Sequence, residues 1–516
     1  MAPKRTLGRH SFFDAPALLA FLEDGLGPGK RDTAERHRRT IQEAAVAAAD
    51  RGSGTLDLSV AAVPNLPAFA RERLPEAFAL LTSSVDSVAT SGDGTTAKFV
   101  VKLQDGHRVE SVLMRHDGGR NTLCVSSQVG CKMGCTFCAT GTLGELGNLT
   151  SGEILEQLAH ARRFAAAKGN GETDAVAFRA AEASAAVTNV VFMGMGEPLN
   201  NYDAVCASLG LLSDARGFAV APSRVTVSTV GVVPKMLALA RDSPEVRLAL
   251  SLHAPNQALR EKIVPTATAY PLPKIMAALD AYLAAGTRAR TRAMIEYCVL
   301  GGVNDEEAHA FELGELLRGR DVIVNLIPFN PTDTPMGHTP PTREAVQAMA
   351  AVLAGPPFGL RTTVRKEMGQ DIAGACGQLA LDAGGARRAF AAGGPGGDLE
   401  DLAGSAGNGF ARAKTVADKK LKKGSVVNGR VAFASKGDVQ TNKSRTTSVQ
   451  TMTSDVPRRA TDVTKKKQIP RHVELAVAAL NATATISMVV LLLAVSWKLA
   501  AHAGWFEDHE RQHAEL

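Results

Sequence analysis

The sequence is poor in aromatic residues and lacks a second group of closely spaced cysteines. Phe, Trp and Tyr make up 5% of its 516 residues, which argues against a protein that binds single strands on a long platform of stacked rings. Seven cysteines and the absence of a recognisable secretory signal indicate a reducing compartment, where thiols serve metals or catalysis rather than disulfides. The formal net charge of +6 is modest, so it permits a nucleic-acid partner without arguing for one.

Three cysteines do lie close together, in the run Cys131-Lys-Met-Gly-Cys135-Thr-Phe-Cys138. Three thiolates can hold three irons of a four-iron, four-sulfur cluster and leave the fourth iron open for chemistry. Structural zinc usually takes four ligands that come in two pairs. The remaining cysteines, at positions 124, 206, 298 and 376, stand alone, so the spacing favours the cluster over zinc.

This spacing, with an aromatic residue before the last cysteine, resembles the radical S-adenosylmethionine (SAM) superfamily. Further runs look like the dual-specificity adenine-2 methyltransferases of 23S ribosomal RNA and transfer RNA. They are Cys124-Val-Ser-Ser-Gln-Val-Gly-Cys131, Gly194-Met-Gly-Glu197-Pro-Leu, Ser251-Leu-His253-Ala-Pro and Cys376-Gly-Gln-Leu. The resemblance covers residues 11 to 382.

The order of apolar and polar runs predicts the domain organisation. Residues 11–86 are expected to form a helical N-terminal RNA-binding domain, and residues 87–120 a β-hairpin linker around Asp105-Gly106. From residue 121 onward strand-like and helix-like runs alternate, which predicts a parallel sheet with right-handed crossovers. The strand candidates are 121–126, 187–193, 224–228, 246–251, 291–299 and 321–327. These six units match an incomplete TIM-like (β/α)6 radical SAM barrel over 121–382, with functional loops at the carboxyl ends of the strands.

The C-terminal part has a different composition. Residues 383–470 are rich in Gly, Ala, Ser, Thr and Lys, which predicts a disordered basic tail. Residues 475–497 carry no charge and are long enough for a transmembrane helix, with an amphipathic or partner-binding helix as the alternative. We therefore expect a cytoplasmic protein, or an organellar one as second choice, with a candidate membrane anchor at its C-terminal end.

The resemblance also implies roles for individual residues. Cys131, Cys135 and Cys138 would hold the [4Fe-4S] cluster, and the open iron would be chelated by the amino and carboxylate groups of SAM. The glycines beside Glu197 let the backbone approach a ligand, and this carboxylate can accept hydrogen bonds from the SAM amine. The SAM contacts implied by the resemblance are Gly196, Glu197, Ser228, Ser251, Leu252, His253 and Asn330.

Cys376 and Cys124 are the second pair of catalytic thiols that the resemblance implies. A first SAM methylates Cys376, and a second SAM gives the radical that takes hydrogen from this S-methyl group. The resulting methylene radical adds to adenine, because carbon 2 has no nucleophilic lone pair for polar methyl transfer. Cys124 then attacks the sulfur of Cys376 and forms a disulfide as the RNA leaves. Glu110 would be the proton acceptor, although one more residue separates it from Cys124 than in the family pattern.

The sequence thus predicts a monomeric radical SAM methyltransferase that acts on carbon 2 of an adenine in large-subunit rRNA, with tRNA as a second substrate. It would use two SAM per turnover and an electron donor such as flavodoxin or ferredoxin. Two alternatives stay open: a carbon-8 adenine methyltransferase, and a zinc-stabilised RNA-binding protein without catalysis. Arg36, Arg38 and Arg39 are candidate phosphate contacts, but for each of them an ordinary solvated helix face is the stronger interpretation.

Overall fold

The computed structural model describes residues 3–166, 187–286, 293–332 and 334–380. All of them belong to Met1–Ala411, the first of two units into which the chain divides. The predicted tail at 383–470 and the predicted span at 475–497 lie outside the described residues. Within the described residues, none of the helices has the length and apolar character needed to cross a bilayer.

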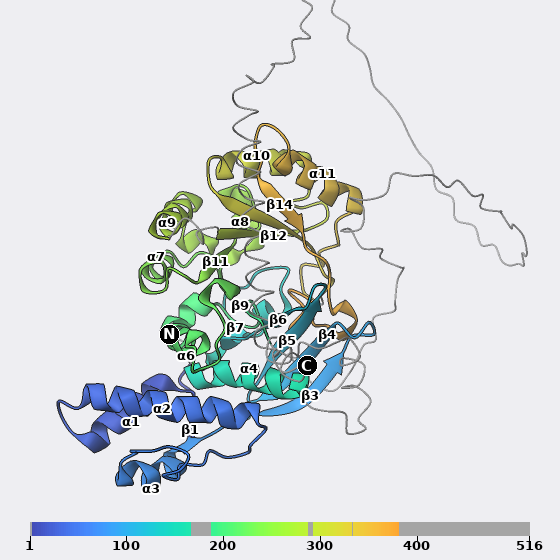
Figure 1. The fold of residues 1–516 in the computed structure, drawn as a ribbon. Coiled ribbons are helices and arrows are strands. Elements are labelled where there is room, and N and C mark those ends of the chain that lie inside the picture. The colour runs from blue at the N-terminus through green and yellow to red at the C-terminus, as the bar shows by residue number, and fades with distance from the viewer. Residues whose placement is uncertain (1–2, 167–186, 287–292, 333, 381–516) are drawn as a thin grey trace, which may run out of the picture. The chain divides into compact units, whose positions relative to one another are not determined.

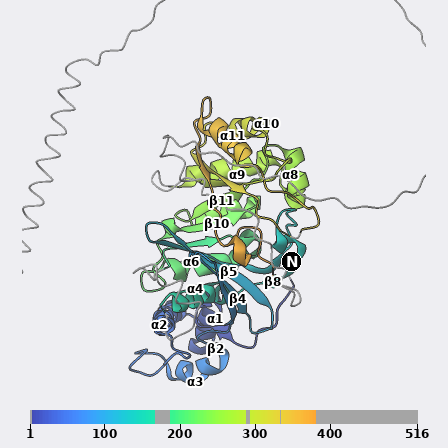
Figure 2. The same cartoon turned by 90° about the vertical axis from the view of Figure 1, so that its right-hand side faces the viewer.

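A ten-stranded sheet organises the described structure, in the order β14-β13-β12-β11-β10-β9-β6-β5-β4-β3. The strands from β6 to β14 are mutually parallel, and Figures 1 and 2 show them stacked above the blue helices of the N-terminal segment. These parallel strands are β6 (Arg120–Cys124), β9 (Asn189–Phe192), β10 (Val225–Thr229), β11 (Arg247–Ser251), β12 (Ala293–Val299), β13 (Val322–Pro328) and β14 (Arg361–Val364).

Helices connect successive parallel strands and cover the outer face of the sheet (Figure 1). They bury apolar stripes at helical spacing; α9, for example, buries Leu272, Ile275, Met276 and Leu279. The helices of this part are α4 (Ser151–Ala166), α6 (Tyr202–Ser213), α7 (Val233–Asp242), α8 (Gln257–Ile263), α9 (Leu272–Ala285), α10 (Glu307–Leu317) and α11 (Arg343–Ala354). Short 3-10 turns are η1 (Ala139–Thr142), η2 (Pro198–Asn201), η3 (Pro222–Arg224), η4 (Pro265–Ala269) and η5 (Gln370–Ile372).

The predicted fold class is confirmed, with one additional strand. Each of the six expected parallel strands is present. The seventh, β14, has the sequence Arg361-Thr-Thr-Val364, in which exposed and half-buried residues alternate. It therefore lacks the apolar pattern on which the prediction depended. Because the edge strands β14 and β3 do not pair with each other, the sheet stays open as an incomplete barrel.

Three antiparallel strands extend the sheet beyond β6. They are β3 (Ser84–Thr90), β4 (Thr96–Lys102) and β5 (Arg108–His116). The expected turn at Asp105-Gly106 joins β4 to β5, and Gly106 has the positive φ of 86° that favours glycine in such turns. Strand β5 pairs with β6, so Val112 lies opposite Cys124. The segment expected to be a linker is therefore part of the barrel sheet.

The N-terminal segment is helical and packs against α4 and α6. It contains α1 (Ala15–Leu26), α2 (Arg31–Asp50) and α3 (Ala68–Ala77), with a short parallel pair of β1 (His10–Ser11) and β2 (Phe78–Ala79). The side chain of Asp14 caps α1 and accepts a hydrogen bond from Ser151 Oγ at 3.0 Å. Arg163 of α4 donates from Nε to the carbonyl of Ala49 at 3.0 Å. The segment is thereby fixed to the barrel rather than attached through one linker.

Candidate active site

The three clustered cysteines lie in a loop between two short strands of a separate antiparallel pair. Strand β7 (Gln128–Cys131) ends at the first cysteine, and β8 (Gly144–Asn148) follows the last one after η1. The loop is anchored to α8, because the backbone N–H of Thr136 donates to Ile263 O at 3.0 Å. The N–H of Cys138 turns back to Cys135 O, also at 3.0 Å. These bonds hold the turn from Cys135 to Cys138 against α8, and Cys131 lies at the end of β7.

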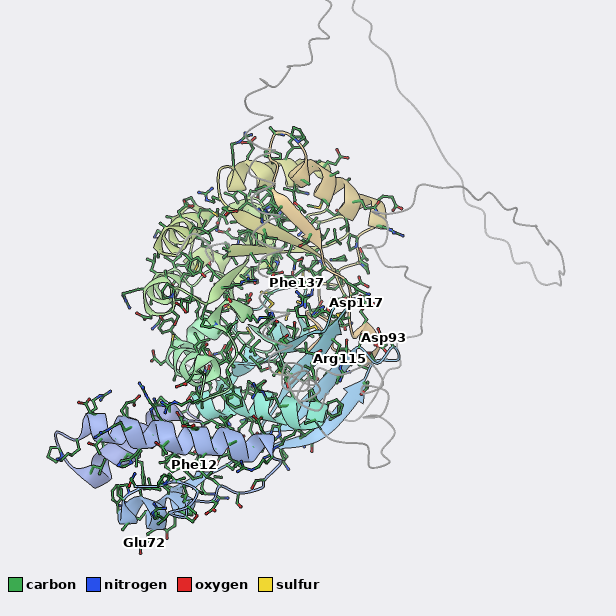
Figure 3. All side chains as sticks on the ribbon, in the orientation of Figure 1. Phe12, Glu72, Asp93, Arg115, Asp117 and Phe137 are labelled. Atoms are coloured by element: carbon green, nitrogen blue, oxygen red, sulfur yellow. The ribbon has the colours of Figure 1, made fainter. Side chains whose placement is uncertain are left out.

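An apolar shell surrounds this turn. Cys135 and Cys138 pack against a cluster that is separate from the main core and is made of Phe137, Ala254, Ile263, Val264, Ala267, Cys298, Leu300 and Phe329. Phe137 lies within the barrel region, far from Phe12 and Glu72 of the N-terminal helices (Figure 3). This apolar contact covers part of Cys135 and Cys138, which remain half-buried, and lower polarity strengthens charge interactions there.

The chemistry of the three thiols fits an iron–sulfur cluster. Burial raises the pKa of all three, that of Cys131 to about 12. Buried thiols of this kind become thiolates at neutral pH only when they bind a metal. Among the described residues, no three His, Cys, Asp or Glu side chains converge as the ligands of one metal ion would. The ligands of a four-iron cluster bind different irons, so they need not converge on one point.

Glu197 lies beside this loop in the turn after β9. Its Oε1 accepts from the N–H of Leu199 at 3.0 Å, and its Oε2 accepts from the N–H of Val230 at 2.9 Å. Burial raises the pKa of this carboxyl, while the bond from Val230 opposes the rise. Its negative charge contributes to the raised pKa of Cys135, so carboxylate and thiols are neighbours.

Gly196 gives this turn its shape. Its φ is 101°, and a Cβ built there would lie 2.6 Å from the Cβ of Gln128. A side chain is therefore excluded both by backbone strain and by space. The turn brings the backbone N–H of Glu197 within 2.8 Å of Gln128 Oε1, which connects the β9 turn to β7.

His253 faces the cysteine loop from the turn after β11. Its ring meets Phe137 edge to face, with 4.8 Å between centroids. Its Nδ1 accepts from the N–H of Cys298 at 3.0 Å, which leaves Nε2 as the protonated nitrogen of the neutral ring. Burial, followed by the nearby charge of Arg260, lowers the pKa of His253 to about 3. The imidazole is therefore a neutral hydrogen-bond donor.

A row of polar side chains crosses the sheet from β10 to β14. Ser228 Oγ lies 3.1 Å from Ser251 Oγ, and Ser251 is in register with Glu296 on β12. Glu296 Oε2 accepts from Asn325 Nδ2 at 2.8 Å, and Asn325 Oδ1 accepts from Thr363 Oγ1 at 3.0 Å. The predicted SAM residues Ser228 and Ser251 thus continue into polar groups on the next three strands.

The loop that carries Cys376 is tied to its surroundings from several sides. Asn330 Nδ2 donates to Cys376 O at 3.0 Å, and Asn330 Oδ1 accepts from Gln370 Nε2 at 2.6 Å. The carbonyl of Gly377 accepts from the N–H of Ala139, next to the last cluster cysteine, at 2.8 Å. Asn330, expected to bind SAM, makes these protein contacts instead in the structure, and its SAM contact stays a prediction.

Cys124 and Cys376 are neighbours although they come from opposite ends of the barrel. Cys124 ends β6 and is 8% exposed. Burial and then the nearby Cys376 raise the pKa of Cys124 to about 12. Burial also raises the pKa of Cys376. At both thiols the positive charge of Arg365 opposes this rise without cancelling it. Both cysteines are free thiols, so the disulfide implied by the resemblance is not formed in this state.

Glu110 lies on β5, beside the strand that ends at Cys124. It is 2% exposed and forms an ion pair with Lys98, whose Nζ is 3.1 Å from Oε1. Lys98 also donates to Ala373 O in the Cys376 loop, at 3.3 Å. Strands β5 and β6 fold back on each other, so the backbone of Glu110 lies beside the segment after Cys124; its role as proton acceptor stays a prediction. Glu110 O accepts from Ser126 Oγ at 2.6 Å.

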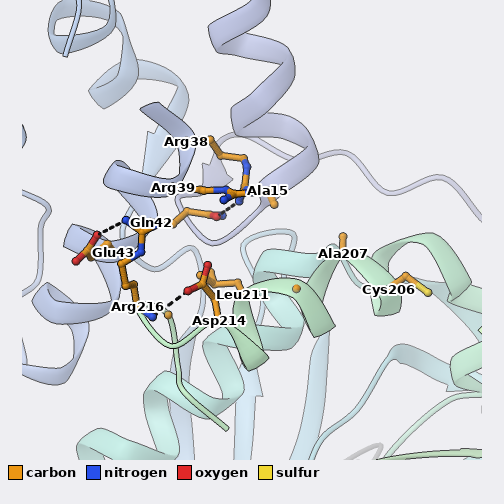
Figure 4. Close-up of a pocket in the computed structure, with 12 residues that line it drawn as sticks. Ala15, Arg38, Arg39, Gln42, Glu43, Cys206, Ala207, Leu211, Asp214 and Arg216 are labelled. Carbon is orange, nitrogen blue, oxygen red and sulfur yellow. Dashed lines mark hydrogen bonds and ion pairs between the residues drawn. The ribbon is translucent and has the colours of Figure 1, made fainter. Parts of the chain in front are cut away.

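Two of the three candidate phosphate contacts on α2, Arg38 and Arg39, line a cavity of about 310 Å³ between α2 and α6 (Figure 4). Arg38 and Arg39 both pair with Glu35 on their own helix. Arg216, across the cavity, pairs with Glu43 at 3.6 Å. Arg36 reaches Thr33 Oγ1 at 3.2 Å. Such pairs are typical of a solvated helix face, and a role in RNA binding stays a prediction.

Comparisons with known proteins agree with this geometry. The family model of the radical SAM superfamily matches residues 125–313. A probable dual-specificity RNA methyltransferase RlmN of Desulforudis audaxviator is 43% identical over 322 residues, which cover 62% of this chain and 93% of the relative. The chain belongs to the RlmN family. A second RlmN protein, from Opitutus terrae, is 42% identical over 62% of this chain and 77% of the relative.

A solved structure supports the same family assignment. A radical SAM methyltransferase from Sphaerobacter thermophilus is 36% identical and superposes with a TM-score of 0.59. The match covers 72% of this chain and 99% of that one. The RlmN-type barrel therefore accounts for most of the described residues.

Three charged residues of this RlmN-type site were not singled out from the sequence: Arg260, Glu296 and Arg365. Glu296 could have been noticed in the sequence, because it is the one acidic residue in the otherwise mostly apolar strand Ala-Met-Ile-Glu-Tyr-Cys-Val. Arg365 lies in the run before Cys376, but only the fold shows that it is close to both thiols. Burial acts to lower the pKa of Arg365, and the charges of Cys376, Glu296 and Cys124 outweigh it and raise the pKa.

Proposed function

We propose that this protein methylates carbon 2 of an adenine in large-subunit rRNA, and also in tRNA, through an S-methyl group carried by Cys376. The observation that carries the proposal is the meeting of Cys124 and Cys376 beside the three-cysteine loop. A methyl carrier needs a second thiol within reach to release the product, and it needs a radical source nearby. The RlmN relatives, which are dual-specificity RNA methyltransferases by name, support this assignment.

In this proposal Cys131, Cys135 and Cys138 would hold a [4Fe-4S] cluster, and residues at the carboxyl ends of the strands would bind SAM. When bound, these cofactors supply reductive cleavage of a carbon–sulfur bond, with two SAM consumed per turnover. Glu197 presents a buried carboxylate to the amino group of SAM. Backbone N–H groups already hold both of its oxygens in place, so little orientation is lost when the ligand binds.

The remaining SAM contacts are neutral. The pair Ser228 and Ser251 offers hydroxyl groups, His253 offers a donor at Nε2, and Gly196 and Leu252 offer backbone. Asn330 acts here on the Cys376 loop, because its amide holds the carbonyl of Cys376. Positioning of the methyl carrier and binding of SAM would thus depend on the same residue.

The two cysteines would divide the work at the adenine. Cys376 carries the methyl group and becomes bonded to the base, and Cys124 attacks the sulfur of Cys376 to release the product as a disulfide forms. Arg365 favours the thiolate of each cysteine, which matters because the thiolate is the nucleophile. Glu110, held by Lys98, takes the proton from the base.

The N-terminal helices of residues 11–86 are proposed to grip the RNA fold, because RNA enzymes of this kind must present a base that has left its stack. Arg36 and Arg39 are exposed and Arg38 is half-buried, so the first two are better placed than Arg38 for a phosphate contact. A flavodoxin-type or ferredoxin-type electron donor, a monomeric state and a cytoplasmic or organellar location are proposed from the resemblance alone.

The test is nucleoside mass spectrometry of rRNA and tRNA after incubation with anaerobically reconstituted protein, SAM and a reductant. The expected product is 2-methyladenosine. The product 8-methyladenosine would overturn the carbon-2 assignment and favour the carbon-8 alternative. A colourless protein that binds stoichiometric zinc and leaves RNA unmodified would overturn the enzyme altogether.

A further inference from the structure

Arg260 on α8 is an arginine with no exposed surface. Burying a guanidinium costs several kcal/mol unless a partner compensates its charge, so its partners need an explanation. Its Nε donates to Leu252 O at 3.1 Å, and its Nη2 donates to Val230 O and, at 3.5 Å, to Ser251 O. These are neutral carbonyls at the ends of β10 and β11. Among the described residues, no carboxylate forms an ion pair with it.

The other terminal nitrogen of Arg260, Nη1, takes part in none of these hydrogen bonds. Nη1 is buried and has no hydrogen-bond partner among the described residues. A role that only fixes strand ends would explain Nε and Nη2, but it leaves Nη1 and the positive charge unexplained. An unmet buried donor normally signals a ligand, a water or an ion that belongs there.

The positive charge of Arg260 acts on the cysteine loop. Burial, Cys138, Cys131 and Glu197 all raise the pKa of Cys135, and Arg260 opposes them. Burial lowers the pKa of Arg260 to about 10, and Cys135 acts in the opposite direction. Arg260 therefore lies close enough to Cys135 for the two charges to interact. It lies on α8, which is bonded to the cysteine loop through Thr136 N–H and Ile263 O.

We propose that Arg260 is a positioning residue that places a positive charge and the Nη1 hydrogen-bond donor on the Cys135 side of the thiolate-held cluster. This inference rests on the proposed function, because it requires the cluster. The reduction potential of an iron–sulfur cluster depends on the net charge around it and on hydrogen bonds to its sulfurs. A cation here stabilises the reduced form, which carries one more negative charge, and so raises the potential. Arg260 thereby eases the electron transfer that begins each turnover.

The test is a redox titration of the cluster, followed by electron paramagnetic resonance, in the full chain without SAM or RNA. Arg260→Gln removes the charge and is expected to shift the midpoint potential to a more negative value. Arg260→Lys keeps the charge and is expected to remain closer to wild type. Arg71→Gln is the matched control, because Arg71 also binds backbone carbonyls, those of Leu58 and Val63, but lies in the N-terminal helices. It should leave the potential unchanged.

Two outcomes of this titration would overturn the proposal. One is an Arg260→Gln protein with a full cluster and the wild-type midpoint. The other is an equal shift in Arg260→Lys and Arg260→Gln, which would assign the effect to the lost carbonyl bonds. If wild-type protein assembles no four-iron cluster, the proposed function fails as well, so the two failures are distinguishable.

A second measurement does not depend on a variant that folds poorly. Wild-type protein labelled with 15N in its arginine guanidinium groups is reduced in the absence of SAM and studied by pulsed electron paramagnetic resonance. A guanidinium nitrogen coupled to the cluster is expected in wild type and not in Arg260→Lys. The absence of any such coupling in wild type would contradict the hydrogen bond from Nη1.

Discussion

The two groups of candidate functional cysteines are built in opposite ways. Cys131, Cys135 and Cys138 lie within eight residues of one another, and the backbone bond from Cys138 N–H to Cys135 O is local. Cys124 and Cys376 come from the first and last parts of the barrel and meet only because the sheet curves around. The first group depends on a short sequence, whereas the second depends on every strand between its two members.

The difference also appears in the charges that each group faces. The loop cysteines face one another and Glu197, and Arg260 is the cation that opposes these charges at Cys135. Cys124 and Cys376 share Arg365, which lowers the pKa of both. The loop thiols thus mainly face negative groups, and a bound metal centre would bring positive charge. At the pair, Arg365 opposes the burial that raises the pKa of both thiols. The following experiments test this division.

The largest effect is expected when one loop cysteine is removed. Alanine at Cys131, Cys135 or Cys138 should abolish iron binding, SAM cleavage and methylation together, because each supplies one of three thiolates. Iron analysis and the yield of 5′-deoxyadenosine measure the first two. Cys206→Ala in α6 is the control and should retain all three. A full cluster in any loop variant would contradict the ligand assignment.

Cys376→Ala should separate the two groups. It should keep the cluster and its absorption, because Cys376 is not a ligand, but RNA methylation should fall to background. Peptide mass mapping of wild-type protein made with an intact cluster should find one added methyl group on Cys376. A variant that still methylates RNA would refute the carrier role.

Cys124→Ala should stop the reaction one step later. The RNA adduct should form on Cys376 but accumulate, because no thiol is placed to attack its sulfur. A denaturing gel should show RNA attached to this protein and not to the Cys124→Ala, Cys376→Ala double variant. Normal turnover without bound RNA would mean that Cys124 is simply a buried thiol.

Arg365→Gln should give the smallest effect, a slowing rather than a block. Without this cation the pKa of Cys124, already about 12 because of burial, rises further, and each unit lowers the thiolate fraction about tenfold. Release of the adduct should therefore be slower and should recover as pH increases, because deprotonation of the thiol rises with pH. Rapid-quench assays across pH measure this. A release rate equal to wild type at every pH would exclude Arg365 from thiolate activation.

Much of this architecture follows from local sequence patterns. The apolar strands that became β9 to β13 and the helices between them have the periods that buried elements require. The turn at Gly196 needs a glycine, and the cysteine spacing limits the chemistry to few options. The hairpin at Asp105-Gly106 was predictable, but its union with the barrel sheet was not, since pairing partners are decided across the chain.

The sequence by itself determined the cluster loop, the order of strands and helices, and the family, because these depend on neighbours along the chain. Only the tertiary structure decided that Cys124 lies near Cys376, that Arg365 acts on the pKa of both, and that Arg260 is buried near Cys135. The physical reason is that electrostatic contacts depend on distance in space and on burial. Both are properties of the packed barrel, and neither can be obtained from the residues that surround each charge in the sequence.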